Sequence, residues 1–162
     1  MINDEIGAGI WWANQQIMHA ADLIKGQYVF VLDDDDFLIC DSFIAELKDL
    51  IENASSPPDV IFVKGFIDLR LMPLRWELPP QRGGIGAPNF IVRNNVFKRH
   101  AKAWNTDRAG DAHFIEAVWT EAPNYNIKWW DKLVFYADPS YGMTEGEKRR
   151  AIENMLLSNG HA

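Results

Sequence analysis

Cysteine is nearly absent from this sequence, because Cys40 is the only one among 162 residues. A single cysteine cannot form a disulfide within one chain, so the sequence gives no sign of an oxidising compartment. Long apolar runs are also missing, since none approaches the roughly 20 residues that a helix needs to cross a bilayer. The N-terminus, with Asp4 and Glu5, is acidic where a secretory signal would be basic. We therefore expect a soluble, cytoplasmic protein without a membrane span.

Positive charge is scarce as well. The chain has 16 Lys and Arg against 23 Asp and Glu, and its net charge is -7. Binding to a nucleic-acid backbone requires clustered basic residues. The nearest such cluster, 93–102, is interpreted as a solvated helix face. Nucleic acid is therefore not expected as a partner.

Apolar and aromatic residues, in contrast, are abundant. Apolar residues make up 48% of the chain, which includes seven tryptophans. A disordered chain would be poor in both, and this length is sufficient to bury a core without disulfides or a structural metal. We expect one folded domain over residues 1–162.

Helices and strands alternate along the first part of the chain. Apolar residues recur at helical spacing over 10–24, and Gly26 follows as a helix C-cap would. The apolar run 28–32 predicts a strand buried on both faces. A helix capped by Asp41 or Ser42, with an apolar face at Phe43, Ile44, Leu47, Leu50 and Ile51, and a strand at 60–63 follow. This alternation predicts an α/β fold with a sheet flanked by helices.

Regular structure is interrupted over residues 71–88, where prolines and glycines are dense. A long irregular segment inside a domain is usually functional or mobile, and we predict a mobile flap here. Further elements are then expected: a strand at 90–92, a helix from Asn94 or Asn95 to Trp104, a helix at 111–121, a strand at 127–136 and a helix opened by a capping box at Thr144 and Glu147. The strands at 28–32, 60–63 and 90–92 are predicted to share one sheet.

Four consecutive aspartates, Asp33 to Asp36, follow the first predicted strand directly. Such a cluster destabilises a fold unless a cation or hydrogen bonds offset the repulsion. A hard cation such as Mn2+ or Mg2+ takes one or two carboxylates together with substrate phosphates. We predict that Asp33 and Asp35 bind the metal, while Asp34 and Asp36 alternate away from it. The alternative is an acidic loop that caps the following turn.

The segment Gly26 to Asp36 resembles the part of family 2 glycosyltransferases in which "G-x-Y" precedes a strand that ends in "L-D-x-D-D". The preceding helix, with Ala13 and Asn14, is similar to that family's "R-N … A" helix. Gly110-Asp111-Ala112-His113-Phe114 resembles the family's "E-D-x-x-aromatic" motif. The resemblance spans roughly residues 8 to 137.

The resemblance implies a GT-A fold and a nucleotide-sugar donor. Asp33 and Asp35 would bracket the metal and the diphosphate of that donor, and Asp111 would stand at the catalytic base. The base would remove a proton from the hydroxyl of a carbohydrate or other acceptor in an inverting transfer. An ordinary helix N-cap is the alternative role for Asp111, since it follows Gly110.

Aromatic residues are candidates for the acceptor site. Trp76 and Trp104 fall in loop-like contexts and are candidates to line an acceptor groove, and His113 is a candidate to border the same cleft. The alternative is core packing, because aromatic rings dominate buried area. We favour core packing for Trp119 and for one of Trp129 and Trp130.

The sequence departs from the family at three places. No segment before Gly7 carries the family's "P-x-Y/F-N" and "D-D-G/S-S" strands, Ala13 replaces a basic residue, and Gly110 replaces a glutamate. A non-catalytic GT-A module that binds sugar, metal or a partner subunit therefore stays open. A haloacid-dehalogenase-type phosphatase also places D-x-D after a strand, but Phe37 stands where that family has Thr or Val.

A sheet without those first strands would expose an edge, and proteins cover such edges. We therefore predict that the chain pairs with a second copy or with another subunit. Sedimentation velocity over a concentration series should detect a species larger than the monomer. A monodisperse monomer at the highest concentration would contradict the prediction.

Overall fold

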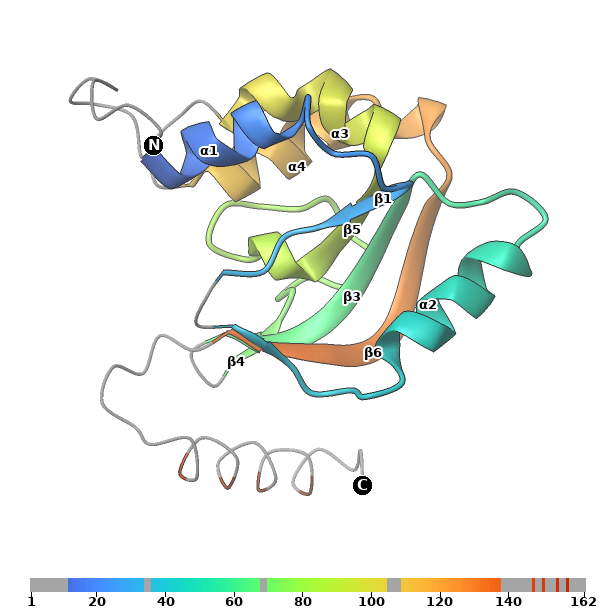
Figure 1. The fold of residues 1–162 in the computed structure, drawn as a ribbon. Coiled ribbons are helices and arrows are strands. Elements are labelled where there is room, and N and C mark those ends of the chain that lie inside the picture. The colour runs from blue at the N-terminus through green and yellow to red at the C-terminus, as the bar shows by residue number, and fades with distance from the viewer. Residues whose placement is uncertain are drawn as a thin grey trace.

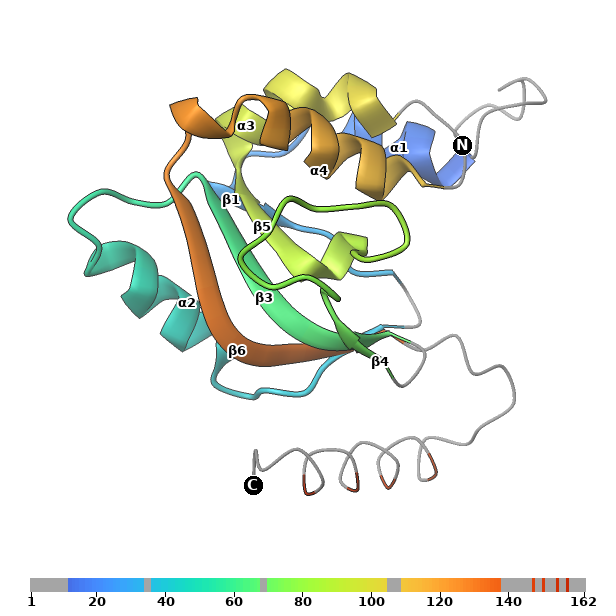
Figure 2. The ribbon, with the colours of Figure 1, turned by 180° about the vertical axis from the view of Figure 1, so that it is seen from behind.

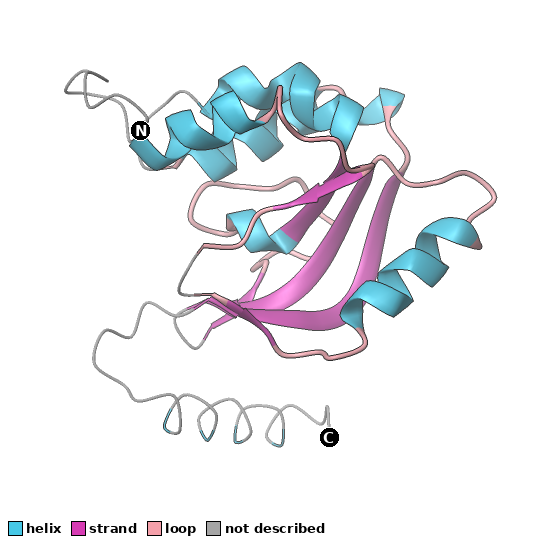
Figure 3. Cartoon of the chain, viewed as in Figure 1, coloured by secondary structure: helices cyan, strands magenta, loops and turns pink. Residues whose placement is uncertain are grey.

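A curled sheet with helices on both faces forms the body of the computed structural model (Figures 1 and 3). The structure describes residues 12–33, 36–67, 70–104 and 109–137, together with positions 147, 150, 154 and 157. The helices are α1 (Trp12–Ala20), α2 (Phe43–Glu52), α3 (Asn94–His100) and α4 (Gly110–Thr120), with short 3-10 turns η1 (Ala87–Asn89), η2 (Ala101–Trp104) and η3 (Ala122–Asn124). The strands are β1 (Tyr28–Phe30), β2 (Phe37–Leu38), β3 (Val60–Ile67), β4 (Arg70–Met72), β5 (Phe90–Arg93) and β6 (Ile127–Ala137).

Over these residues the sheet has six strands in the order β1-β5-β3-β6-β2, and β4 pairs with the end of β3. Strands β3 and β6 run parallel, whereas the other pairs are antiparallel. The fold is therefore mixed α/β, with β3 in the middle and the two short strands β1 and β2 at the edges.

The two faces of the sheet are covered by different helices. Side chains alternate along a strand, so Val60 and Phe62 of β3 face one layer while Ile61 and Val63 face the other. Helices α1, α3 and α4 pack on the first face, and α2 packs on the second. None of the described helices combines the length and apolar character needed to cross a bilayer.

A bulge in β6 bends the sheet. Residues in this bulge contact helix α2. The pairing of β6 with β3 shifts between Phe62 and Lys64, which leaves extra residues on β6. Trp130 in this bulge stacks on Phe43 with 6.1 Å between ring centroids, and Lys132 Nζ lies 2.5 Å from Glu46 Oε2. The bulged strand thus contacts α2 through both an aromatic ring and an ion pair.

The expected common sheet is confirmed, because β1, β3 and β5 belong to it. The first strand differs from expectation in length and place. It ends at Phe30, not at residue 32, and it is an edge strand in which only Val29 is buried. As an edge strand, β1 has only one neighbouring strand. Its continuous run of apolar residues is explained by packing between the helix layers on the two faces of the sheet, and not by a position in the centre of the sheet.

The helix ends also differ from the pattern. Helix α1 ends at Ala20, before the expected residue 24, so Gly26 is not its C-cap. Asn94 does not cap α3, whose N-cap is Arg93. The Nδ2 of Asn94 instead donates to the carbonyls of Ile24 (3.1 Å) and Gly26 (2.7 Å). These hydrogen bonds connect the turn before β1 to the start of α3.

Helix α2 begins after Ser42, one of the two expected caps. Its predicted apolar face is correct for Phe43, which is buried, but wrong for Ile44, which is 65% exposed. One residue along a helix turns the side chain by about 100°, so Ile44 does not share the face of Phe43. The expected capping box at Thr144 lies outside the described residues.

Gly65 lies directly against Phe135 of the neighbouring strand. A Cβ built at Gly65 would lie 2.3 Å from the Phe135 ring, which is fully buried. Gly65→Ala is therefore expected to lower the free energy of unfolding by about 1–3 kcal/mol, the usual cost of overpacking a core. Chemical denaturation measures this change.

Gly26→Ala is the matched control, because its nearest neighbour would be the Tyr28 carbonyl oxygen at 3.4 Å, an ordinary contact. We expect a change within about 0.5 kcal/mol there. Adding Phe135→Leu to Gly65→Ala should give a loss smaller than the sum of the two single losses, since both act on one contact. Additive losses would mean that the ring does not limit residue 65.

Candidate functional site

Asp33 and Asp36, which follow β1 in the chain, are joined by two hydrogen bonds. The Asp33 N–H donates to Asp36 Oδ2 (3.2 Å), and the Asp36 N–H donates to the Asp33 carbonyl (3.1 Å). Asp34 and Asp35, between them, lie outside the described residues. Asp36 lines the same cleft as Asp33, so the expectation that it points away from the site is wrong. Whether Asp36 is a metal ligand stays a prediction.

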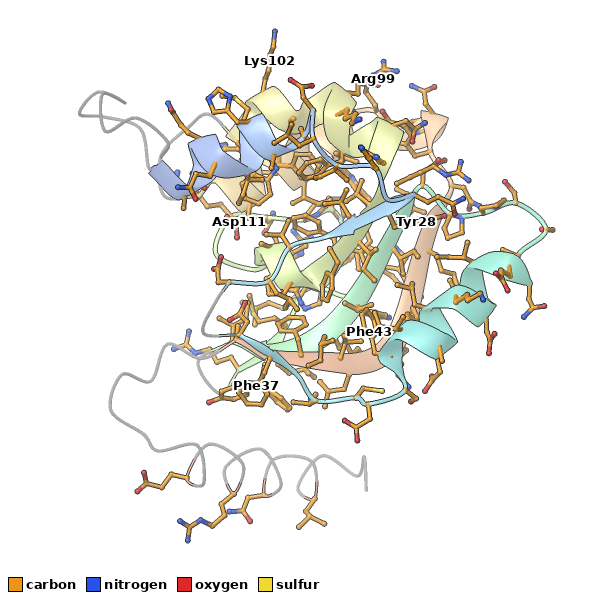
Figure 4. All side chains as sticks on the ribbon, viewed as in Figure 1. Tyr28, Phe37, Phe43, Arg99, Lys102 and Asp111 are labelled. Atoms are coloured by element: carbon orange, nitrogen blue, oxygen red, sulfur yellow. The ribbon has the colours of Figure 1, made fainter. Side chains whose placement is uncertain are left out.

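Asp33 and Asp36 share one cleft with Asp111, which is more than seventy positions further along the chain. The cleft has a volume of about 370 Å³. Its remaining walls come from the ends of β3 and β6, from Met72 and from the segment 83–88. Figure 4 shows Asp111 beside the segment that leaves β1. The structure thus brings together the two motifs on which the family resemblance rests.

The predicted flap does wall this cleft, through Met72, Gly83 and the residues up to Pro88. It is also anchored, since Ile85 is 5% exposed and the Arg82 N–H donates to Glu116 Oε1 of α4 (3.1 Å). Figure 2 shows the segment on the same face of the sheet as α4. Its mobility stays a prediction.

Asp111 lies in the first turn of α4 and is partly buried. Burial raises the pKa of its carboxyl, and the negative charge of Asp33 raises it further. Backbone N–H groups of Ala112 (2.8 Å), Ala87 and Asp111 itself bind the carboxylate and act in the opposite direction on this pKa. The result is a fixed carboxylate that is more basic than an exposed one, as a proton acceptor requires.

The N-cap of α4 is Ala109, so the alternative role of Asp111 as the cap is wrong. Its position just inside the helix still favours a negative charge, because the N-terminus of a helix carries a partial positive charge. This turn therefore supports the ionised form even though burial disfavours it.

Helix α1 fixes the place where α4 begins. Asn14 is 6% exposed, and a Cβ built at Gly110 would lie 2.5 Å from Asn14 Nδ2. A side chain at residue 110 would therefore require Asn14 to move. The close approach of the two helices sets the position of Asp111 over the cleft.

The expectation that Trp104 lines an acceptor groove is wrong. Its side chain is 2% exposed and packs against Phe114 of α4, with 5.5 Å between ring centroids. The 3-10 turn η2 presses against α4, so the ring fills the core. Trp76 contacts Trp129 edge-on at 5.0 Å, and neither Trp76 nor His113 is among the residues that line the aspartate cleft.

Core packing is confirmed for Trp119, whose ring contacts Phe62 at 6.1 Å. It holds for both of the consecutive tryptophans of β6, since Trp129 stacks on Phe62 at 4.1 Å and Trp130 on Phe43 at 6.1 Å. These two rings serve opposite faces of the sheet, as strand alternation requires.

Carboxylates are the only ionisable groups among the described residues that line the cleft. Within the described part of the chain, no set of three His, Cys, Asp or Glu side chains is arranged around a metal position. Asp33 and Asp36 offer two carboxylates, and the contribution of Asp35 stays a prediction. The geometry can therefore supply part of a cation shell and leave the rest to a ligand.

Comparison with known proteins gives a distant structural likeness. No family model matches the sequence, and no curated protein matches it. Among solved structures, the chain is similar to a putative glucose-1-phosphate thymidylyltransferase from Bacillus anthracis in complex with a sucrose, with a TM-score of 0.46 and 12% identity. The match covers 94% of this chain and 63% of that one, so this chain spans less than two thirds of its length.

The raised pKa of Asp111 makes stability depend on pH. A carboxyl whose pKa is higher in the folded state binds its proton more tightly there, so its ionisation costs stability as the pH rises through that folded pKa. Asp111→Asn should therefore raise the free energy of unfolding at neutral pH, on the order of 1 kcal/mol. This gain should vanish below the unfolded pKa, near about 3.9.

Thermal unfolding of the parent and the variant between acidic and neutral pH measures the effect. Asp41→Asn removes an exposed carboxylate outside the cleft and should change stability by less than about 0.5 kcal/mol. A variant at residue 111 that is less stable than the parent at neutral pH would contradict the expectation.

Proposed function

We propose that this chain is a GT-A-type glycosyltransferase domain, similar to family 2, that binds a nucleotide-sugar through a divalent cation and transfers the sugar to an acceptor hydroxyl. The observation that carries the proposal is the single cleft shared by the aspartate turn after β1 and by Asp111. By the family resemblance, the aspartate turn would bind the metal and the diphosphate, and Asp111 would be the base. A shared cleft supports the proposal, because it would let both groups act on one substrate.

The charge of the cleft supports a cation. Asp33, Asp36 and Asp111 line it, and none of its other described lining residues is basic. A bound Mn2+ or Mg2+ would offset the repulsion between carboxylates that line one cleft. Asp33 and Asp35 would hold the cation, and Asp36 lines the same cleft as Asp33. When bound, the metal would stabilise the negative charge of the departing diphosphate.

Asp111 would accept the proton of the acceptor hydroxyl. Its backbone N–H partners fix the carboxylate, while burial and the charge of Asp33 raise its pKa and so its basicity. Gly86 leaves room in front of it, because a Cβ there would lie 3.8 Å from Asp111 Oδ2 and 2.7 Å from Ile67 Cδ1. A side chain at residue 86 would occupy space that an acceptor needs.

A second candidate is a non-catalytic module completed by a partner subunit. The open edge of β1 favours it. The Gln27 carbonyl accepts from the Asn94 N–H, so the antiparallel alternation turns the backbone groups of Tyr28 and Phe30 outward. These groups could pair with a strand of another chain. Such a module would bind ligands without turnover.

Calorimetry with Mn2+ and a mixture of uridine and guanosine diphosphates tests the proposal. The parent should bind the nucleotide weakly without metal and more tightly with it. Asp35→Asn should lose the metal-dependent part, by tenfold or more, because a carboxylate ligand is removed. Asp34→Asn is the matched control and should largely keep it.

Asp111→Asn separates the two candidates. As a base variant it should retain metal-dependent nucleotide binding and lose transfer, with a kcat reduced on the order of 10²–10⁴-fold. No binding by the parent under any of these conditions would sink the enzyme proposal. Binding without transfer to any offered acceptor would favour the partner-completed module.

A further inference from the structure

A second, smaller pocket adjoins the aspartate cleft. Its volume is about 200 Å³, and it shares Gly83 and Ile85 with the first. The segment 73–84 forms most of its lining, and Trp129 of β6 closes one side. Drug-sized ligands usually occupy larger cavities, so this pocket suits a small ring or a single charged group.

Arg75 in this pocket has a partly buried side chain without a partner. It makes no hydrogen bond, ion pair or ring contact with another residue in the described part of the chain. Arg93, which is also partly buried, pairs with Asp59 at 3.1 Å. The chain has 23 Asp and Glu against 16 Lys and Arg, so acidic partners are not scarce in this protein. None of the described residues that line the pocket is acidic.

The loop that carries Arg75 is held in shape by its own backbone. The Leu74 N–H donates to the Gly84 carbonyl and the Gly84 N–H to the Gln81 carbonyl, both at 2.9 Å. Glu77 adopts a left-handed φ of 57°. A glutamate rarely takes this conformation, which tends to persist where a segment binds a ligand.

Trp129 gives the pocket a rigid aromatic wall. Its ring stacks on Phe62 at 4.1 Å and is braced edge-on by Trp76 at 5.0 Å and by Trp119 at 6.3 Å. A fixed aromatic ring next to an unpaired guanidinium suits a ligand with both an apolar ring face and an anionic group. Guanidinium binds carboxylate and phosphate through two parallel hydrogen bonds.

We propose that this pocket is the acceptor subsite and that it takes an anionic sugar, whose carboxylate or phosphate binds Arg75 and whose ring lies against Trp129. The role as an acceptor subsite rests on the proposed transferase function, because the pocket shares Gly83 and Ile85 with the cleft that Asp111 lines. The binding of an anionic sugar does not depend on it.

Titrations of the 15N-labelled protein with glucuronate, glucose 6-phosphate and glucose test this binding. The reporter is the Trp129 indole N–H signal, assigned with Trp129→Phe, and neither metal nor nucleotide is present. We expect saturable shifts with at least one anionic sugar and at least tenfold weaker binding of glucose. The two anionic probes distinguish a carboxylate from a phosphate ligand, and inorganic phosphate tests the contribution of the ring.

Arg75→Gln should weaken binding of the anionic sugar by tenfold or more, and Arg75→Lys should lose less because it keeps the charge. Arg70→Gln removes the same charge from exposed β4, outside the pocket, and should bind as the parent does. Equal binding of glucose, no saturable shift, or an Arg75→Gln variant that is folded and binds normally would each overturn the proposal. Calorimetry of nucleotide binding tests the proposed function separately, and none of these outcomes would decide its result.

Discussion

Strand β3 is the element on which the rest of the structure depends. Its residues Val60 to Val63 are fully buried, and it pairs with β5 and β4 along one side and with β6 along the other. Alternate side chains of this one strand therefore contact the helices on both faces of the sheet. Because β3 extends to Ile67, its far end also reaches the aspartate cleft. The site thus lies where this buried strand, paired on both sides, ends.

Periodicity was sufficient to predict the alternation of elements and the common sheet, since the runs at Val60–Val63 and Phe90–Val92 are continuous and β-rich. Periodicity could not show that β1 is an edge strand. A run of apolar residues looks the same in the sequence whether the strand is covered by helices or lies between two other strands. Trp104 was misplaced for a related reason. Its position between two helical segments looked like a loop, but η2 packs it on Phe114.

The meeting of Asp33 and Asp111 is a property of tertiary structure that no local pattern contains. Only the family resemblance connected them, and the structure shows both side chains lining one cleft. Asp36 was not predicted to face the cleft, because the alternation of side chains in a strand was assumed to continue beyond the end of β1. Arg75 was missed altogether, although an arginine beside Trp76 in a proline- and glycine-rich segment is a signal that could have been followed.

Opposite charges lie in adjacent pockets that share a wall at Gly83 and Ile85. In the proposed transferase, the aspartate cleft would take the diphosphate through a cation, whereas the Arg75 pocket would bind an anion directly. Each of two anionic substrates would then have its own counter-charge. An acceptor whose anion is bound at Arg75 would turn a hydroxyl towards Asp111 while the donor lies on the metal side. The segment 73–88 contributes to both pockets, so a change in this segment would alter the binding of both proposed substrates.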